Sequence, residues 1–163
     1  MLAVAFACVF LSPVSRVLFF AAAGILCAYE LSHNYEKLNV YCGAWVMFVY
    51  IGAQALLALF HAGTTAYIAC MAGSIYLALF DGIIRHKVSG DGAVYTIMGL
   101  AYPSFLFGLL MMISVSPKWL EVLTLACLST WVCDSFALFG GKRFGKHRVA
   151  PSVSPNKTVE GCI

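Results

Sequence analysis

Six long apolar runs fill most of the sequence, and short breaks rich in proline, glycine or charged residues separate them. A helix needs about 20 consecutive apolar residues to cross a bilayer. With 62% hydrophobic and only 10% charged residues, the composition excludes an ordinary soluble globule. We therefore predict an all-α, polytopic transmembrane protein with about six spans. The runs cover approximately residues 1–11, 14–31, 42–60, 64–84, 92–115 and 119–139.

The breaks and the basic residues predict how the chain crosses the membrane. Each break is short, so neighbouring helices form antiparallel hairpins. Most Lys and Arg residues fall on one side, whereas Arg16 and Lys118 fall on the other. The positive-inside rule then places both termini in the cytoplasm, and a bacterial cytoplasmic membrane suits the short loops. We divide the chain into a transmembrane helical domain, 1–139, and a cytoplasmic phosphate-binding segment, 140–163.

Cysteine and histidine do not predict a metal or redox centre. The seven cysteines include no C-x-x-C pair, and most lie within apolar runs, where they are typical of small buried hydrophobes. The four histidines have no spacing that suits metal ligands.

Three acidic residues lie inside or beside predicted spans, where an unpaired charge is costly. Glu30 and Asp81 are near helix ends, so we expect their carboxylates to reach water. Asp134 lies about a turn and a half before the predicted end of the last span, which is too deep for easy solvation. Two interpretations stay open for Asp134: it binds a metal or orders basic residues, or it pairs structurally with Lys142 or Arg143.

A basic, glycine-rich segment, 140–148, follows the last span. Glycines let a backbone approach an anion, and lysines and arginines neutralise phosphate charge, so the segment predicts phosphate binding. A basic segment directly after a span typically faces lipid head groups or a phosphate-bearing substrate, so nucleic acid is not expected. Further on, Ser154 and Pro155 predict the start of a helix whose N-terminus would meet a phosphate beside Lys157. No P-loop is present. On these grounds alone, a basic lipid anchor and a nucleotide site are equally open.

Four motifs in this region together resemble the phosphatidate cytidylyltransferase (CDP-diacylglycerol synthase) family. They follow one another in order within about 28 residues, as in the family. They are Asp134-Ser135, Gly140-Gly141-Lys142-Arg143-Phe144-Gly145-Lys146-His147, Ala150-Pro151 and Ser154-Pro155-x-Lys157-Thr158-x-Glu160-Gly161.

The resemblance implies transfer of CMP from CTP to phosphatidate, giving CDP-diacylglycerol and pyrophosphate with a divalent cation such as Mg²⁺. It implies CTP, phosphatidate and membrane lipid as partners and leaves a homodimer open. Asp134 and Lys157 are the candidate catalytic residues, and Asp134 is also the candidate metal ligand. The candidate substrate-binding residues are Lys142, Lys146, Ser154, Lys157, Thr158 and Glu160.

One departure from the family is large. The family signature that carries the metal-binding carboxylates lies further toward the C-terminus, and the sequence stops at Ile163 before it. We therefore expect the start of a truncated catalytic region and no activity from these residues alone. Two alternatives stay open: a CTP-dependent polyprenol or phytol kinase, and a non-enzymatic membrane protein whose tail binds anionic lipid.

Overall fold

The computed structural model describes residues 11–84, 91–145, 147–150 and 154–159. The chain divides into two compact units, Met1–Trp119 and Leu120–Ile163. The first run, about 1–11, falls almost entirely outside the described residues.

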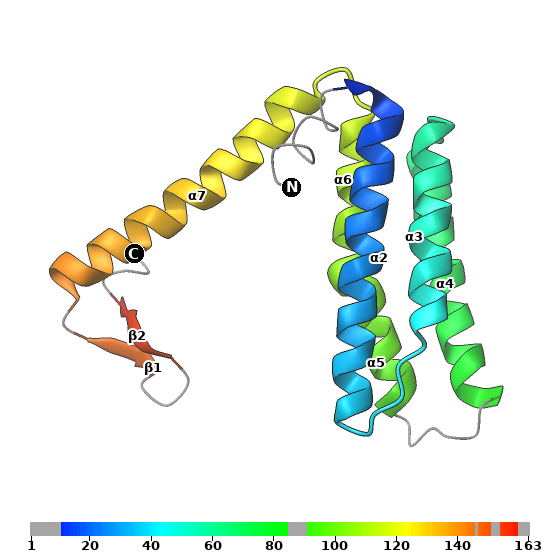
Figure 1. Cartoon of the computed structure of the whole chain (residues 1–163), viewed down its shortest axis with the longest axis horizontal. Helices are drawn as coiled ribbons and strands as arrows, with labels where there is room; N and C mark the ends of the chain where they lie inside the picture. The colour runs from blue at the N-terminus through cyan, green and yellow to red at the C-terminus, as the bar shows by residue number, and fades with distance from the viewer. Residues whose placement is uncertain (1–10, 85–90, 146, 151–153, 160–163) are drawn as a thin grey trace. The chain divides into compact units, whose positions relative to one another are not determined.

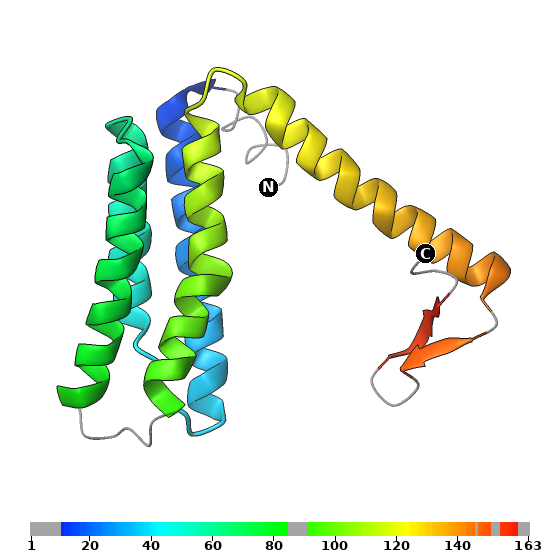
Figure 2. The same cartoon turned by 180° about the vertical axis from the view of Figure 1, so that it is seen from behind.

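The first unit is a bundle of helices that run side by side, as Figures 1 and 2 show from opposite sides. Helix α2 packs against α3 and α6, and α3 also packs against α4. The π-helical turn η1 joins α5 to α6. The elements are α2 (Pro13–Lys37), α3 (Ala44–Leu59), α4 (Thr64–Ile84), α5 (Asp91–Gly99), η1 (Leu100–Ser104) and α6 (Phe105–Ser114).

The helices confirm an all-α polytopic membrane protein. Within the described residues, four helices are long and apolar enough to cross a bilayer, and α3 is a shorter apolar helix of 16 residues. The predicted run 64–84 coincides with α4. The four long helices are Pro13–Lys37, Thr64–Ile84, Gly92–Ser114 and Trp119–Phe144.

Helix α2 begins where the Ser-Pro break predicts. Ser12 caps the helix: its hydroxyl accepts from the Ser15 backbone N–H at 3.1 Å, and the Ser15 hydroxyl accepts from the Ser12 N–H at 3.0 Å. Pro13 follows at the first helical position, where its missing N–H is not needed. The helix then continues past the predicted end at 31 to Lys37, because the residues there are polar but still compatible with a helix.

The run predicted as one span, 92–115, is interrupted in its middle. Tyr102 leaves helical geometry (φ −150°, ψ 114°) immediately before Pro103, which has no N–H for the helical ladder. The Ser104 hydroxyl donates to the Gly99 carbonyl at 2.8 Å and satisfies one of the acceptors freed there. The span therefore consists of two helices, α5 and α6, joined through η1.

Small residues allow close helix contacts in this bundle. A Cβ built on Gly24 of α2 would lie 3.1 Å from Cβ of Phe107 of α6. In the first turn of α2, Arg16 is buried, and its Nε donates to the Ser114 carbonyl at 2.9 Å. Its guanidinium lies 4.0 Å from the Trp119 ring centroid. Glycine at the helix contact and a partnered arginine at the end thus hold α2 against α6.

The second unit contains α7 (Trp119–Phe144) and the antiparallel strands β1 (Arg148–Ala150) and β2 (Ser154–Thr158). Helix α7 passes through the predicted domain boundary at 139/140 and continues to Phe144. None of its residues is buried within this unit, and Cys127 and Cys133 are exposed there.

The helix predicted to begin at Ser154 is wrong, because these residues form strand β2. The residue before a proline favours extended backbone, so Ser154-Pro155 is equally compatible with a strand. Pairing with β1 then decides between the two structures, with Arg148 opposite Thr158 and Ala150 opposite Ser154. A small β-hairpin thus follows the helices.

Candidate phosphate-binding site

The end of α7 carries two exposed cations on its last turn, Lys142 and Arg143. The C-terminal end of a helix carries partial negative charge, so basic side chains there are stabilised. After the helix, exposed Arg148 begins β1. These side chains give the region a net positive charge.

The hairpin returns strand β2 to the end of α7, as Figure 1 shows. The Val159 N–H donates to the His147 carbonyl at 2.9 Å, just beyond the Arg148–Thr158 pair. Thr158 also touches Gly145, the residue that follows α7. We call this meeting point the basic corner and define it by Lys142, Arg143, Gly145, Arg148 and Thr158.

The basic corner brings together two of the predicted substrate-binding residues, Lys142 and Thr158. The backbone of Lys157 is beside Thr158 in β2. Ser154 is at the opposite end of the strand, about 13 Å along it from Thr158 at 3.3 Å per residue, so it does not join the corner. Lys146 and Glu160 lie outside the described residues.

The electrostatics of the basic corner differ from those predicted. The sequence suggested that a helix N-terminus at Ser154 would attract phosphate, but that segment is a strand, which has almost no net dipole. The helix end at the basic corner is instead the C-terminus of α7, whose partial negative charge repels anions. Attraction for a phosphate must therefore come from the cationic side chains.

Asp134 lies on α7 away from the basic corner. It is exposed, and ten residues separate it from Phe144, which is about 15 Å at 1.5 Å per residue. The same spacing puts it about 12 Å along the helix from Lys142, far beyond ion-pair distance. Direct pairing of Asp134 with Lys142 or Arg143 is therefore excluded within the continuous helix.

The described residues offer few candidate ligands for Mg²⁺. They contain no group of three or more His, Cys, Asp or Glu side chains that could hold a metal ion. Asp134 is a single carboxylate, and none of the described residues of the basic corner is acidic. Asp134 as a metal ligand stays a prediction from the sequence.

Asp81, in the first unit, has an environment that the sequence did not predict. The expectation that its carboxylate reaches water is wrong, because the residue is only 7% exposed. The Tyr41 hydroxyl donates to its Oδ2 at 2.6 Å. Beside them, the Gly43 N–H donates to Thr96 Oγ1 at 2.8 Å. Together these contacts hold the segment before α3 against α4 and α5.

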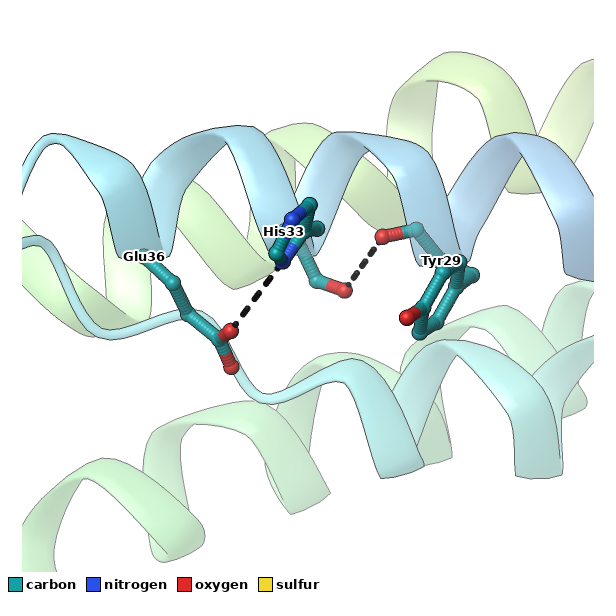
Figure 3. A network of polar contacts seen from close by, with 4 residues as sticks. Tyr29, His33 and Glu36 are labelled. Atoms are coloured by element: carbon teal, nitrogen blue, oxygen red, sulfur yellow. Dashed lines mark hydrogen bonds and ion pairs between the residues drawn. The ribbon is translucent and has the colours of Figure 1, made fainter.

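Glu30 is exposed, as expected, near the end of α2. Separate polar contacts involve Tyr29, His33 and Glu36 on the same helix, as Figure 3 shows. His33 Nδ1 lies 3.6 Å from a Glu36 carboxylate oxygen, and the His33 ring stacks on Tyr29 with centroids 6.1 Å apart. The pair is half exposed, so it adds little to stability.

Comparison with known proteins identifies a matching family and relatives that share one name. The profile of the cytidylyltransferase family matches residues 1–163, the whole chain. The phosphatidate cytidylyltransferase of Staphylococcus saprophyticus is 30% identical over 93 residues, which are 57% of this chain and 35% of that protein. The phosphatidate cytidylyltransferase of Thermotoga maritima is 54% identical over 39 residues, 24% of this chain and 14% of that protein. The matches thus span about a third or less of these relatives. No solved structure matches the chain.

Proposed function

Because the chain belongs to the cytidylyltransferase family, we propose that it acts in the transfer of CMP from CTP to phosphatidate, giving CDP-diacylglycerol and pyrophosphate. The observation that carries the proposal is the basic corner, in which motif residues from α7 and β2 meet. The relatives named phosphatidate cytidylyltransferase support the same reaction.

The chemistry requires no covalent enzyme intermediate. A phosphate oxygen of phosphatidate attacks the α-phosphorus of CTP in line, a new P–O bond forms, and the bond to the β-phosphate breaks to release pyrophosphate. Two anions must be held together, and negative charge accumulates on the leaving group. Positioning and charge neutralisation are therefore the main contributions that the protein can make.

The basic corner supplies cations for this task. Lys142, Arg143 and Arg148 are exposed, so a triphosphate can approach them directly. Lys157 follows as a further candidate because its backbone adjoins Thr158 in β2. The family resemblance alone implies binding roles for Lys146, Ser154 and Glu160. It also implies a catalytic role with Mg²⁺ for Asp134.

The position after a span suits a lipid substrate. Helix α7 has 26 residues, about 39 Å at 1.5 Å per residue, which exceeds a hydrocarbon core of about 30 Å. Its end therefore reaches the head-group region, where the phosphate of phosphatidate lies. The distribution of Lys and Arg favours the cytoplasmic side, in a bacterial cytoplasmic membrane.

The proposal is tested by CTP binding to the chain in lipid nanodiscs. Lys142→Gln should weaken binding about 10- to 150-fold, since a hydrogen bond to a charged group contributes roughly 1.5–3 kcal/mol. Lys118→Gln is the matched control, because Lys118 is also exposed but lies at the N-terminal end of α7. It should leave the Kd unchanged. Absence of CTP binding, or equal losses in both variants, would contradict the proposal.

A further inference from the structure

Gly145 is the point at which the β-hairpin meets the end of α7. Its N–H donates to the Gly141 carbonyl at 3.0 Å, which is the last helical hydrogen bond. A Cβ built on Gly145 would lie 2.6 Å from Thr158 Cγ2 and 2.7 Å from Thr158 Oγ1, and it would also overlap the Gly141 carbonyl oxygen. The side chain of Thr158 thus occupies space that any residue other than glycine would need at position 145.

The environment of the Thr158 hydroxyl is unusual for a group that binds substrate. Its Oγ1 is buried and has no hydrogen-bond partner among the described residues. A buried hydroxyl without a partner is unfavourable, and an apolar group of the same shape can replace it at little or no loss. In this geometry the hydroxyl faces the backbone of Gly145 rather than an approaching anion.

Thr158 is also the last residue of β2, where the strand pairs with the start of β1. It pairs with Arg148, and the next residue, Val159, donates to the His147 carbonyl at 2.9 Å. A shift of Thr158 would therefore move the end of β2, including its neighbour Lys157, relative to Lys142. The contact with Gly145 sets that position.

We propose that Gly145 and Thr158 form a positioning contact that holds the end of β2 against α7, and that Thr158 acts through its shape rather than as a phosphate ligand. Its consequence for CTP rests on the proposed function of the basic corner. The contact between Gly145 and Thr158 does not rest on that function, because it can be measured without nucleotide. The assignment differs from the ligand role that the family resemblance implies for Thr158.

Two conservative variants separate shape from hydroxyl chemistry in the chain in nanodiscs. Thr158→Val keeps both branches of the side chain and removes the hydroxyl, whereas Thr158→Ser keeps the hydroxyl and removes the methyl group. The Val variant should keep the CTP Kd within about twofold. The Ser variant should weaken it more than the Val variant does, by up to about fourfold, which corresponds to ~0.8 kcal/mol for one buried methyl group. The reverse order would establish Thr158 as a hydroxyl ligand and overturn the proposal.

Hydrogen exchange provides the measurement that needs no CTP. The Val159 N–H, bonded to His147, should keep its protection in Thr158→Val and exchange about fourfold faster in Thr158→Ser. Equal exchange in both variants, or faster exchange in the Val variant, would overturn the positioning contact. Failure of the wild-type chain to bind CTP would instead overturn the proposed function and leave the exchange result to decide this inference.

Discussion

Removal of the Tyr41 hydroxyl is predicted to destabilise the helix bundle. In Tyr41→Phe, the Asp81 carboxylate loses a hydrogen bond of 2.6 Å, a length typical of a strong charge-assisted O–H···O bond. Asp81 is 7% exposed, so water does not readily replace the lost donor. Hydrogen bonds to charged groups contribute about 1.5–3 kcal/mol, and we expect the free energy of unfolding to fall by that amount.

The assay is reversible unfolding in mixed micelles, followed by far-UV circular dichroism. Tyr76→Phe is the matched control, because Tyr76 is also a tyrosine but is 74% exposed, and its unfolding free energy should stay within about 0.5 kcal/mol of wild type. A double variant, Tyr41→Phe with Asp81→Asn, should lose less than the sum of the two single variants. Equal effects of the two Tyr→Phe changes, or strict additivity in the double variant, would show that the Tyr41–Asp81 hydrogen bond does not stabilise the bundle.

Two further predictions concern the packing of α2 against α6. Gly24→Ala should destabilise the bundle by about 1–3 kcal/mol, because the added Cβ would lie 3.1 Å from Cβ of Phe107. Gly52→Ala is the control, because a Cβ at Gly52 would have nothing within 4 Å. In the same unfolding assay it should be neutral or slightly stabilising. Arg16→Met should lower the free energy of unfolding by about 1.5–3 kcal/mol, because the Ser114 carbonyl loses a charged donor. An unchanged free energy of unfolding would show that the hydrogen bond from Arg16 to Ser114 does not stabilise the bundle.

Local sequence signals predicted the helices well. Ser12-Pro13 marks the start of α2 because capping depends on neighbouring residues only. The run 64–84 coincides with α4 because the break at His61 to Gly63 separates it from the preceding run and Arg85 ends its apolar sequence. The interruption before Pro103 was missed, since a tyrosine and a proline barely change the hydropathy of an apolar run. Hydropathy thus identifies spans but not their internal geometry.

Features that depend on distant contacts could not be predicted. Ser154-Pro155 begins either a helix or a strand, and pairing with β1 decides. Burial of Asp81 depends on Tyr41, forty residues earlier in the chain. The family motifs did indicate Lys142 and Thr158, which the structure brings to one corner. They could not show that Thr158 packs on Gly145, because that contact depends on the hairpin.

We propose that the segment around the basic corner serves CMP transfer from CTP to phosphatidate. The most direct measurement supplies phosphatidate and CTP labelled at the α-phosphorus to a chimera. In it, residues 134–161 of this chain replace the aligned segment of the Staphylococcus saprophyticus phosphatidate cytidylyltransferase. We predict that label enters CDP-diacylglycerol and that Lys142→Gln strongly reduces this transfer. Label released entirely as CDP would indicate a lipid kinase. Label left in CTP while the parent enzyme is active would contradict the proposed CMP transfer.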